Sequence, residues 1–532
     1  MLPVSNRPDF ALPAPPIAQP AAAPAPTVRQ TRRAFAALAL TPAIVVIVVT
    51  AASLGRWDLF AMLALVLMVP CVLWISGGAA TAILGLTRSG VARQAVPAAW
   101  APVTKTAILI TLCRETPEPV AKRAGALARA IRAAGLEHAL EVVILSDTFG
   151  TTAVAAEETA FAALRAKGLV TYRRRTDNTG RKPGNIADWI TNQGAGFDHM
   201  VVLDADSRMT LSRVLGLVWR METNRRLGLL QTGIAQVAAQ TRFGAMQRIA
   251  VRLLSPGFGA GLASWAGTSG NFWGHNAIIR IEAFRSAAMT LPVLPGAAPM
   301  GGPILSHDFV EAAFLRRAGW EVALDPDLVG SAEEAPQTLQ EFHRRDRRWC
   351  QGNLQHLRVM TMPGLSPLSR LHMAAGIGGY LAAPAWLLLL VLTASGALVV
   401  ESALPILLVA ALLLTPKAVG LSRYLKRSTP WRARVALRAT ATELVLSALV
   451  APLVMVRQSC AVIDVALGRD CGWKSARKAR FTLPAGAAEA TVGAALAALT
   501  AYANPAAALW IAPVVLPLLA APVLIRWLEA QA

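Results

Sequence analysis

The sequence predicts a multi-pass α-helical membrane protein that carries a cytosolic, Rossmann-like α/β domain. The 532 residues are 55% hydrophobic, and their mean hydropathy of +0.47 is higher than a soluble chain requires. Apolar runs of membrane length lie toward both ends of the chain. The middle instead alternates short β-branched runs with segments of helical spacing. This alternation is typical of a parallel, doubly wound sheet.

Membrane topology explains the strong positive charge better than nucleic-acid binding does. The chain has 52 basic and 31 acidic residues, a net charge of +21. The basic residues cluster beside the apolar runs, where cytoplasmic loops collect positive charge, and no recognisable nucleic-acid module accompanies them. The five cysteines are scattered and form no Cys-x-x-Cys pair, which argues against a disulfide framework or a structural zinc site. We therefore expect a lipid bilayer as a partner and no nucleic acid.

The first 90 residues predict a tail followed by a membrane hairpin. Residues 1–31 are rich in Pro and Ala, which predicts a disordered tail. The hairpin occupies residues 32–90, where apolar runs at 34–54 and 59–86 are each long enough to span a bilayer. Basic residues flank it on both sides, so both ends are expected in the cytoplasm.

Residues 91–366 predict the cytosolic domain. The expected strands are 107–111, 141–146, 169–172 and 199–203, with a helix at 119–136. The last of these strands delivers Asp204 and Asp206 to the carboxyl edge of the sheet, where open α/β folds hold ligands. Two carboxylates at this spacing can share a hard divalent cation, with a sugar-nucleotide diphosphate as a further ligand.

Residues 367–532 predict a C-terminal transmembrane bundle. Apolar runs at 374–392 and 403–421 predict two spans joined to a basic cytoplasmic connection. Two final runs, 491–502 with extensions and 506–525, predict a last hairpin around Asn504-Pro505, which makes about six spans.

The run at 435–456 is ambiguous. It is apolar enough to cross, but the stretch after it is basic and would then lie outside. We therefore expect an interfacial or re-entrant helix in which Arg438 and Glu443 face polar surroundings. The stretch 457–482 includes Trp473-Lys-Ser475 and Arg477, and the family resemblance described below implies that it could form a gating loop over the ligand site.

Further charged residues occur along the domain in an order that indicates a shared site. They are Glu115, Asp147, the Asp204–Asp206 pair, Asp308 in Ser306-His-Asp308, and the run Arg344-Arg-Asp-Arg-Arg-Trp349. Carboxylates at several strand ends of one sheet converge in space. Over residues 107–353 this order resembles the family-2 glycosyltransferases, which are inverting enzymes. The resemblance implies the nucleotide-diphospho-sugar transferase form of the Rossmann-like fold.

Several segments resemble, more narrowly, the branch of this family that makes osmoregulated periplasmic glucans. They are residues 173–175, 181–185, 273–280, 305–312, 330–334 and 344–353. Two departures from the wider family also suit this branch. The base motif is Ser-His-Asp instead of Thr-Glu-Asp, and Arg345 stands where the family has Gln.

The resemblance implies how the donor would be held. Glu115 and Asp147 match positions that hold the uracil and ribose. Lys182, in the pattern Lys-x-Gly-Asn185, matches a diphosphate contact, for which a Lys point charge is suited. Asp204 and Asp206 match the diphosphate–metal site, and Mg²⁺ or Mn²⁺ is the expected ion.

The resemblance also implies the acceptor side. Asp308 matches the general base that takes a proton from the acceptor hydroxyl. Arg345, Arg348 and Trp349 match the Gln-x-x-Arg-Trp pattern, in which Trp contacts the acceptor sugar and Arg neutralises charge on the departing diphosphate. His275, in a Gly-His-Asn turn, fits an acceptor-site contact and a structural hydrogen bond equally well.

Structural interpretations remain open for these residues. Asp206 with Ser207 could cap a helix, and Asp308 could be a first-turn carboxylate. The basic run 344–348 could only set topology, and residues 173–175 could be a solvated surface.

As an enzyme, the chain would be an inverting, metal-dependent glucosyltransferase of a bacterial inner membrane. The resemblance implies UDP-glucose and a growing β-linked, β-1,2 glucan as substrates, export to the periplasm, and a periplasmic glucan-processing protein as a partner. One alternative is a family-2 enzyme that uses a lipid acceptor or makes cellulose or hyaluronan. An alternative of another class is a non-catalytic membrane channel that senses UDP-sugar.

Overall fold

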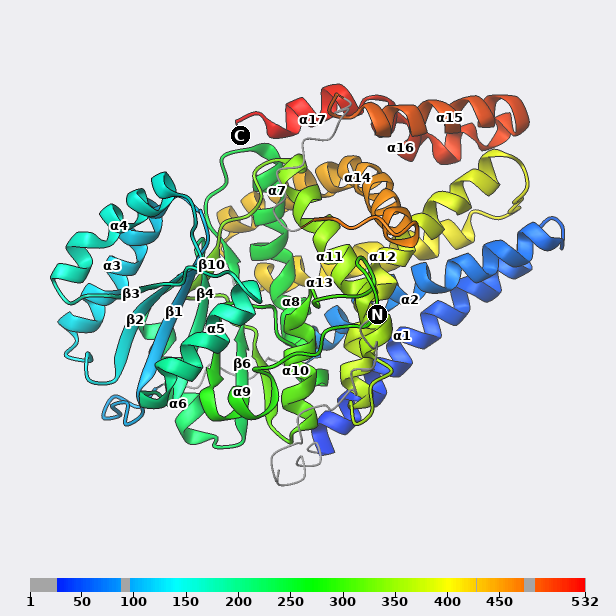
Figure 1. Cartoon of the computed structure of the whole chain (residues 1–532). Coiled ribbons are helices and arrows are strands. Elements are labelled where there is room, and N and C mark those ends of the chain that lie inside the picture. Colours follow the sequence, from blue (N-terminus) through cyan, green and yellow to red (C-terminus); the bar gives the residue numbers. More distant parts are fainter. Residues whose placement is uncertain (1–25, 88–95, 427, 473–483, 532) are drawn as a thin grey trace, which may run out of the picture.

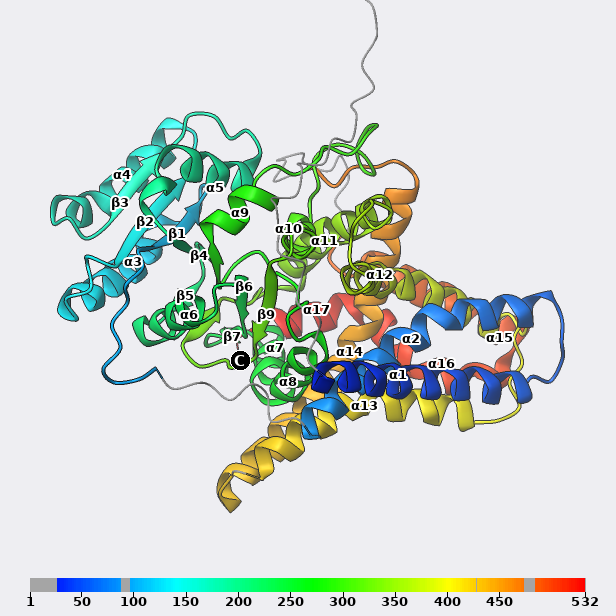
Figure 2. The same cartoon turned by 90° about the horizontal axis from the view of Figure 1, so that it is seen from below.

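The structure is a computed structural model that describes residues 26–87, 96–426, 428–472 and 484–531. A sheet domain lies on one side of the molecule, and the long apolar helices lie on the other (Figures 1 and 2). The shared tip of α1 (Pro26–Ala52) and α2 (Leu59–Thr87), in blue, reaches furthest from the sheet in both views.

A seven-stranded sheet forms the core of the domain, in the order β3-β2-β1-β4-β8-β6-β9. The strands are β1 (Thr106–Leu112), β2 (Leu140–Ser146), β3 (Thr171–Arg174), β4 (His199–Asp204), β6 (Leu227–Thr232), β8 (Ala277–Arg280) and β9 (Glu321–Asp325). The four predicted strands all form and pair in parallel. The sheet as a whole is mixed, because β8 runs antiparallel to both β4 and β6.

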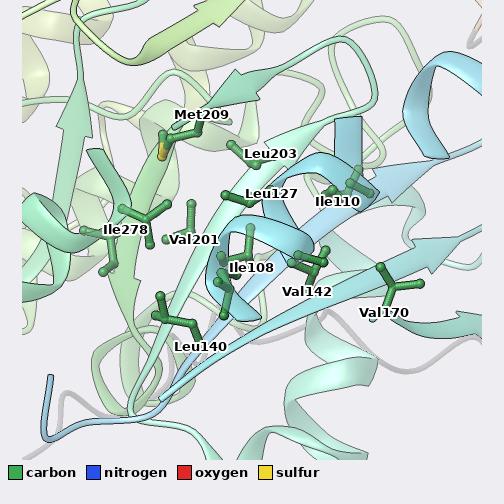
Figure 3. Packing of buried hydrophobic residues seen from close by; sticks show 14 of the residues in the cluster. Ile108, Ile110, Leu127, Leu140, Val142, Val170, Val201, Leu203, Met209 and Ile278 are labelled. Atoms are coloured by element: carbon green, nitrogen blue, oxygen red, sulfur yellow. The ribbon is translucent and has the colours of Figure 1, made fainter. Parts of the chain in front are cut away.

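Helices cover both faces of this sheet, as a doubly wound fold requires. One face packs on α3 (Pro117–Ala133), α4 (Thr151–Ala166) and α6 (Leu211–Thr223), and Figure 3 shows Leu127 of α3 over Ile108 and Val142. The other face packs on α5 (Arg181–Asn192), α9 (Ile281–Ala287) and α10 (His307–Arg317). Apolar side chains at alternate strand positions therefore enter two separate cores.

A second, three-stranded sheet has the order β5-β10-β7. Its strands are β5 (Arg208–Met209), β7 (Ala235–Gln236) and β10 (Ser331–Glu333). β10 pairs antiparallel with β5 and parallel with β7. Its strand β5 begins two residues after Asp206, so the small sheet adjoins the carboxyl edge of the large sheet.

Among the described residues, five helices are long and apolar enough to cross a membrane, or up to six if a bent pair counts as one span. The five are α1 (Pro26–Ala52), α2 (Leu59–Thr87), α12 (Pro367–Ala394), α13 (Leu404–Leu425) and α14 (Pro430–Ala466). The bent pair is the region of α16 (Ala508–Leu519) and α17 (Ala521–Glu529), with an angle of 62° between its parts. α15 (Ala487–Ala503) packs on α16.

Several boundaries differ from the sequence prediction. Residues 26–31, which the sequence prediction assigned to the tail, are helical, because α1 begins at Pro26 and Thr31 Oγ1 donates to Thr27 O within it; residues 1–25 lie outside the described residues. The second arm of the last hairpin breaks near Ala520 instead of continuing to 525. Residues 457–466 are helical, since α14 extends through them, and the gating residues 473–477 lie outside the described residues. The interfacial placement of α14 stays a prediction; Arg438 is exposed, while Glu443 is buried.

One part of the sheet domain's sequence packs within the membrane helices. α7 (Arg242–Ile249), the π-helical turn η2 (Ala250–Leu254) and α8 (Ser255–Ala266) follow β7. α8 lies directly against α2: a methyl group on Gly261 would come within 1.7 Å of Thr81 O, and one on Gly85 within 1.9 Å of Gly257 O. Glycine at these positions lets the two helix backbones touch.

Candidate active site

The predicted acidic residues gather at the carboxyl edge of the large sheet. Thr111 of β1 pairs with Asp204 of β4, and Thr111 Oγ1 lies 3.4 Å from Asp204 Oδ1. Asp147 follows β2 immediately, and its N–H donates to Leu112 O over 2.8 Å. Because β1, β2 and β4 are parallel, they end at the same edge and bring these side chains together.

Lys182 joins Asp204 to a glycine turn. Its Nζ donates to Asp204 Oδ1, and to Gly274 O over 2.8 Å. Burial tends to raise the pKa of Asp204, but the charges of Lys182 and His275 outweigh it and lower that pKa to about 2. Asp204 is therefore ionised throughout the neutral range.

Asp206 and Asp204 form an electrostatically unfavourable pair that a cation would relieve. Burial and the Asp204 charge raise the pKa of Asp206, partly countered by Arg345, whose Nη2 lies 3.8 Å from Asp206 Oδ2. In the described parts of the chain, no group of three or more His, Cys, Asp or Glu side chains could hold a metal. Two carboxylates alone suit Mg²⁺ or Mn²⁺ when phosphate oxygens complete the ligand set. The residues present thus fit a diphosphate–metal site.

Asp308 lies in the first turn of α10, close to the same glycine turn. A methyl group on Gly274 would stand 3.5 Å from Asp308 Oδ2. Burial raises the pKa of Asp308; the neighbouring His307 lowers it, and Glu311 raises it further. His307 is held by its own helix, since His307 Nδ1 lies 2.9 Å from Glu311 Oε1. Asp308, Lys182 and Asp204 therefore cluster around Gly274.

The helix α11 (Leu339–Val359) carries the remaining predicted motif. Arg345 Nη2 donates to Glu341 Oε1 over 2.9 Å as well as approaching Asp206. Burial lowers the pKa of Arg348, as do Arg345 and other nearby cations, and Trp349 is 49% exposed. A concentration of guanidinium groups with a half-exposed indole is suited to an anion and a sugar ring.

The opposite face of α11 contacts the membrane helices. Asp346 Oδ1 accepts from Tyr380 of α12 over 2.9 Å, and Arg347 Nη2 lies 2.9 Å from Asp464 Oδ2 of α14. α11 thus belongs to both the site and the bundle.

The residues predicted to hold the uracil and ribose of the sugar donor lie further along the sheet edge. Asp147 is buried and forms a two-point ion pair with Arg175, at 2.6 and 2.9 Å. Glu115 is exposed, and its carboxylate accepts from the N–H of Cys113. Asn185 is buried and accepts from Arg173 Nη1 over 2.9 Å. Two of the arginines at 173–175 are therefore engaged with predicted site residues and are not merely a solvated surface.

Glu333 was not among the predicted site residues. Its Oε2 lies 3.3 Å from His275 Nε2, and burial raises its pKa, as do the charges of Asp206 and Asp204. The adjacent acids at 333 and 334, inside one of the segments that carried the resemblance, were the only sequence signal for it.

The fold and the site define a nucleotide-diphospho-sugar transferase domain of mixed α/β type. Residues 199–454 match the family model "Glycosyl transferase family group 2". Over these residues the chain matches the family-2 glycosyltransferases, and the predicted family resemblance is confirmed.

Curated relatives sharpen this assignment. The chain is 43% identical over 417 residues to the glucans biosynthesis glucosyltransferase H of Vibrio cholerae serotype O1. It is 41% identical over 414 residues to the enzyme of that name in Shewanella sp. strain ANA-3. Each match covers 72% of this chain and 57% of the relative, so the match spans little more than half of the relatives' length.

Among solved structures, the mannosyltransferase PcManGT from Pyrobaculum calidifontis, in complex with GDP-Man and Mn²⁺, is also similar. It is 15% identical, with a TM-score of 0.46, over 77% of this chain and 98% of that one.

Proposed function

We propose that the chain is an inverting glucosyltransferase that builds a β-linked glucan, with β-1,2 linkages, from UDP-glucose. The observation that best supports this is the cluster of Lys182, Asp204 and Asp308 around Gly274. In this cluster a cation suited to a diphosphate, a carboxylate suited to a metal and a candidate base lie close together, which supports the proposal. The names of the glucosyltransferase relatives support glucose as the transferred sugar.

The residues divide the reaction between them. Asp308 takes the proton of the acceptor hydroxyl, and its raised pKa makes it a stronger base than an ordinary carboxylate. The acceptor oxygen then bonds to the anomeric carbon on the face opposite the diphosphate. The bond from that carbon to the diphosphate oxygen breaks, and UDP leaves with the electron pair, which inverts the anomeric centre.

Positive groups stabilise the departing diphosphate. Lys182 supplies one charge and Arg345 and Arg348 of α11 supply two more. A bound Mg²⁺ or Mn²⁺, held by Asp204 and Asp206, would neutralise further diphosphate charge. Trp349, half-exposed on the same helix, offers the acceptor sugar an apolar face. Asp147 and Glu115 would contact the uridine, with Asn185 supporting Arg173 beside them.

We place the chain in a bacterial inner membrane with the sheet domain in the cytoplasm, where UDP-glucose is made. The five or six apolar helices found in the described part of the chain, and the basic residues beside them, support this orientation. The growing glucan would pass through the helices to the periplasm and meet a glucan-processing protein there.

The test uses inverted membrane vesicles and radiolabelled UDP-glucose. The wild type should deposit a water-soluble β-1,2 glucan in the lumen, and omission of Mg²⁺ and Mn²⁺ should abolish this. Asp308→Asn should lower the rate by about 10²–10⁴-fold, the usual contribution of a general base. Glu137→Gln, an exposed carboxylate paired with Arg132 at the end of α3, is the control and should retain full activity.

Other outcomes select the alternatives. Full activity of Asp308→Asn would contradict the base assignment. Label found only in an organic extract would indicate a lipid acceptor, and a β-1,4 or mixed product would indicate a cellulose-type or hyaluronan-type enzyme. Binding of UDP-glucose without any transfer would favour a sensing channel.

A further inference from the structure

The strand β10 contacts both turns that carry the site. Ala332 and Ser331 pair with Arg208 and Met209 of β5, directly after the Asp204–Asp206 turn. On the other side, Asn276 Nδ2 donates to Ser331 Oγ over 2.9 Å and to Ala332 O over 3.4 Å. Asn276 follows Gly274 and His275, so two consecutive residues of β10, Ser331 and Ala332, connect the two turns.

Two adjacent carboxylates extend these connections. Glu334 Oε1 lies 3.3 Å from Arg123 Nη1 and 3.1 Å from Arg208 Nη2. Arg123 Nη2 in turn donates to Ala205 O, the carbonyl between the two candidate metal-binding aspartates. Arg123 belongs to α3, and its buried Nε has no hydrogen-bond partner among the described residues. Glu334 therefore helps to hold the guanidinium of Arg123 in place, and Arg123 in turn holds the Asp204–Asp206 turn.

Glu333 acts on the other turn. Its Oε2 lies 3.3 Å from Nε2 of His275, whose Nδ1 is 2.9 Å from Asn276 Oδ1. The neighbouring Gly274 carbonyl accepts from Lys182. Glu333, the last residue of β10, and Glu334, which follows it, thus reach the Lys182 end and the Asp204–Asp206 end of the same site.

We propose that Glu333 and Glu334 are positioning residues that fix the distance between the Asp204–Asp206 turn and the 274–276 turn, and so set the affinity for the metal–nucleotide diphosphate. Glu334 acts through Arg123 on Ala205 O, and Glu333 acts through His275. Residues that orient metal ligands in this indirect way typically change metal affinity or activity by about 10–100-fold. The proposal deepens the proposed function and rests on it for the identity of the nucleotide.

The test measures Mn²⁺ binding by the detergent-purified full chain in the presence of UDP, from the electron paramagnetic resonance signal of free Mn²⁺. Glu334→Gln should weaken Mn²⁺ binding about 10-fold or more. It should raise the UDP-glucose KM while leaving kcat at saturating metal within about 3-fold. Glu334→Asp, which keeps the charge, should recover part of the affinity. Glu333→Gln should act in the same direction.

Two further variants separate positioning from a general structural role. Arg123→Met should weaken binding like Glu334→Gln, and combining the two should add little, because both remove one chain of contacts. Glu137→Gln removes a similarly exposed, Arg-paired carboxylate far from the site and should bind Mn²⁺ as the wild type does. Wild-type affinity in Glu334→Gln and Glu334→Asp, or a loss confined to kcat, would overturn the proposal.

The outcome is separable from that of the proposed function. A wild type that binds Mn²⁺ and UDP but transfers no glucose would contradict the function. If Glu334→Gln still weakened binding in that case, the positioning role would stand. A wild type that transfers glucose alongside an unaffected Glu334→Gln would refute only the positioning role.

Discussion

The surroundings of two carboxylates of the site shift their pKa values in opposite directions. Asp204 is paired with Lys182 and has a pKa of about 2, whereas burial raises the pKa of Asp308 above its ordinary range. With such different pKa values, Asp204 stays charged and is suited to bind a metal ion, whereas Asp308 is suited to accept a proton.

The pH dependence should follow from Asp308. In the proposed mechanism Asp308 acts in its ionised form, so kcat/KM should fall as the pH drops through its raised pKa, at a higher pH than an ordinary aspartate with a pKa near 4 would give. The stability effect has the opposite sign, because a raised folded-state pKa means that ionised Asp308 disfavours the fold at neutral pH. Asp308→Asn should thus be slower by about 10²–10⁴-fold yet at least as heat-stable as the wild type at pH 7. The pH profile of kcat/KM checks the first point, and thermal unfolding at pH 7 checks the second. A fall of kcat/KM only near pH 4 would contradict the raised pKa on which both rest.

Candidate site residues could be predicted from the sequence, but their partners could not. Strand-end carboxylates could be predicted because β-branched runs mark where parallel strands end. The pairing of Asp147 with Arg175, and of His275 with Glu333, joins segments that are remote in sequence or on different strands. No local pattern encodes such pairs, since they depend on how the strands assemble.

At the scale of elements, the parallel half of the sheet could be predicted and the rest could not. The runs for β1, β2 and β4 are continuous and apolar, so their extent differs from prediction by about one residue at each end. β8 is four residues long and follows a Gly-rich loop, so its sequence contains no signal of its antiparallel direction. The length of α14 was also missed, because charged residues interrupt the apolar pattern while the helix continues.

The contact between α2 and α8 allows a matched glycine test. Gly85→Ala would place a methyl group 1.9 Å from Gly257 O, which we expect to destabilise the protein by about 1–3 kcal/mol, as overpacking does. Gly78→Ala in the same helix has no atom within 4 Å of the added methyl group and should be neutral. Thermal unfolding in detergent measures both; equal stability of the two variants would contradict direct backbone contact.

At the scale of the whole molecule, one ion pair connects α13 to α14. Lys417 Nζ lies 2.7 and 2.6 Å from the two oxygens of Glu443 and donates to Ser447 Oγ over 2.8 Å. Glu443 was expected to face polar surroundings, and Lys417 supplies them. A charge held this way between apolar helices is costly to leave unpaired.

Removing one member of this pair should therefore be worse than removing both. Lys417→Met or Glu443→Leu alone should cost about 3–5 kcal/mol of stability, and the double variant should recover most of it. Thermal unfolding of the three variants in detergent measures the coupling. Additive losses would show that the pair is not coupled.

The backbone contact of α8 with α2 also bears on how such proteins can change over time. Residues 242–266 lie between β7 and the loop that carries Gly274, yet they pack as part of the membrane bundle. The transferase and the membrane portion are therefore interleaved along the chain, and Trp265 and Ala266 of α8 pack in one cluster with Leu84 of α2. We expect that exchanging either portion alone for another lineage's version would fail at this contact, because a larger side chain on one helix has to be matched by a smaller one on its neighbour.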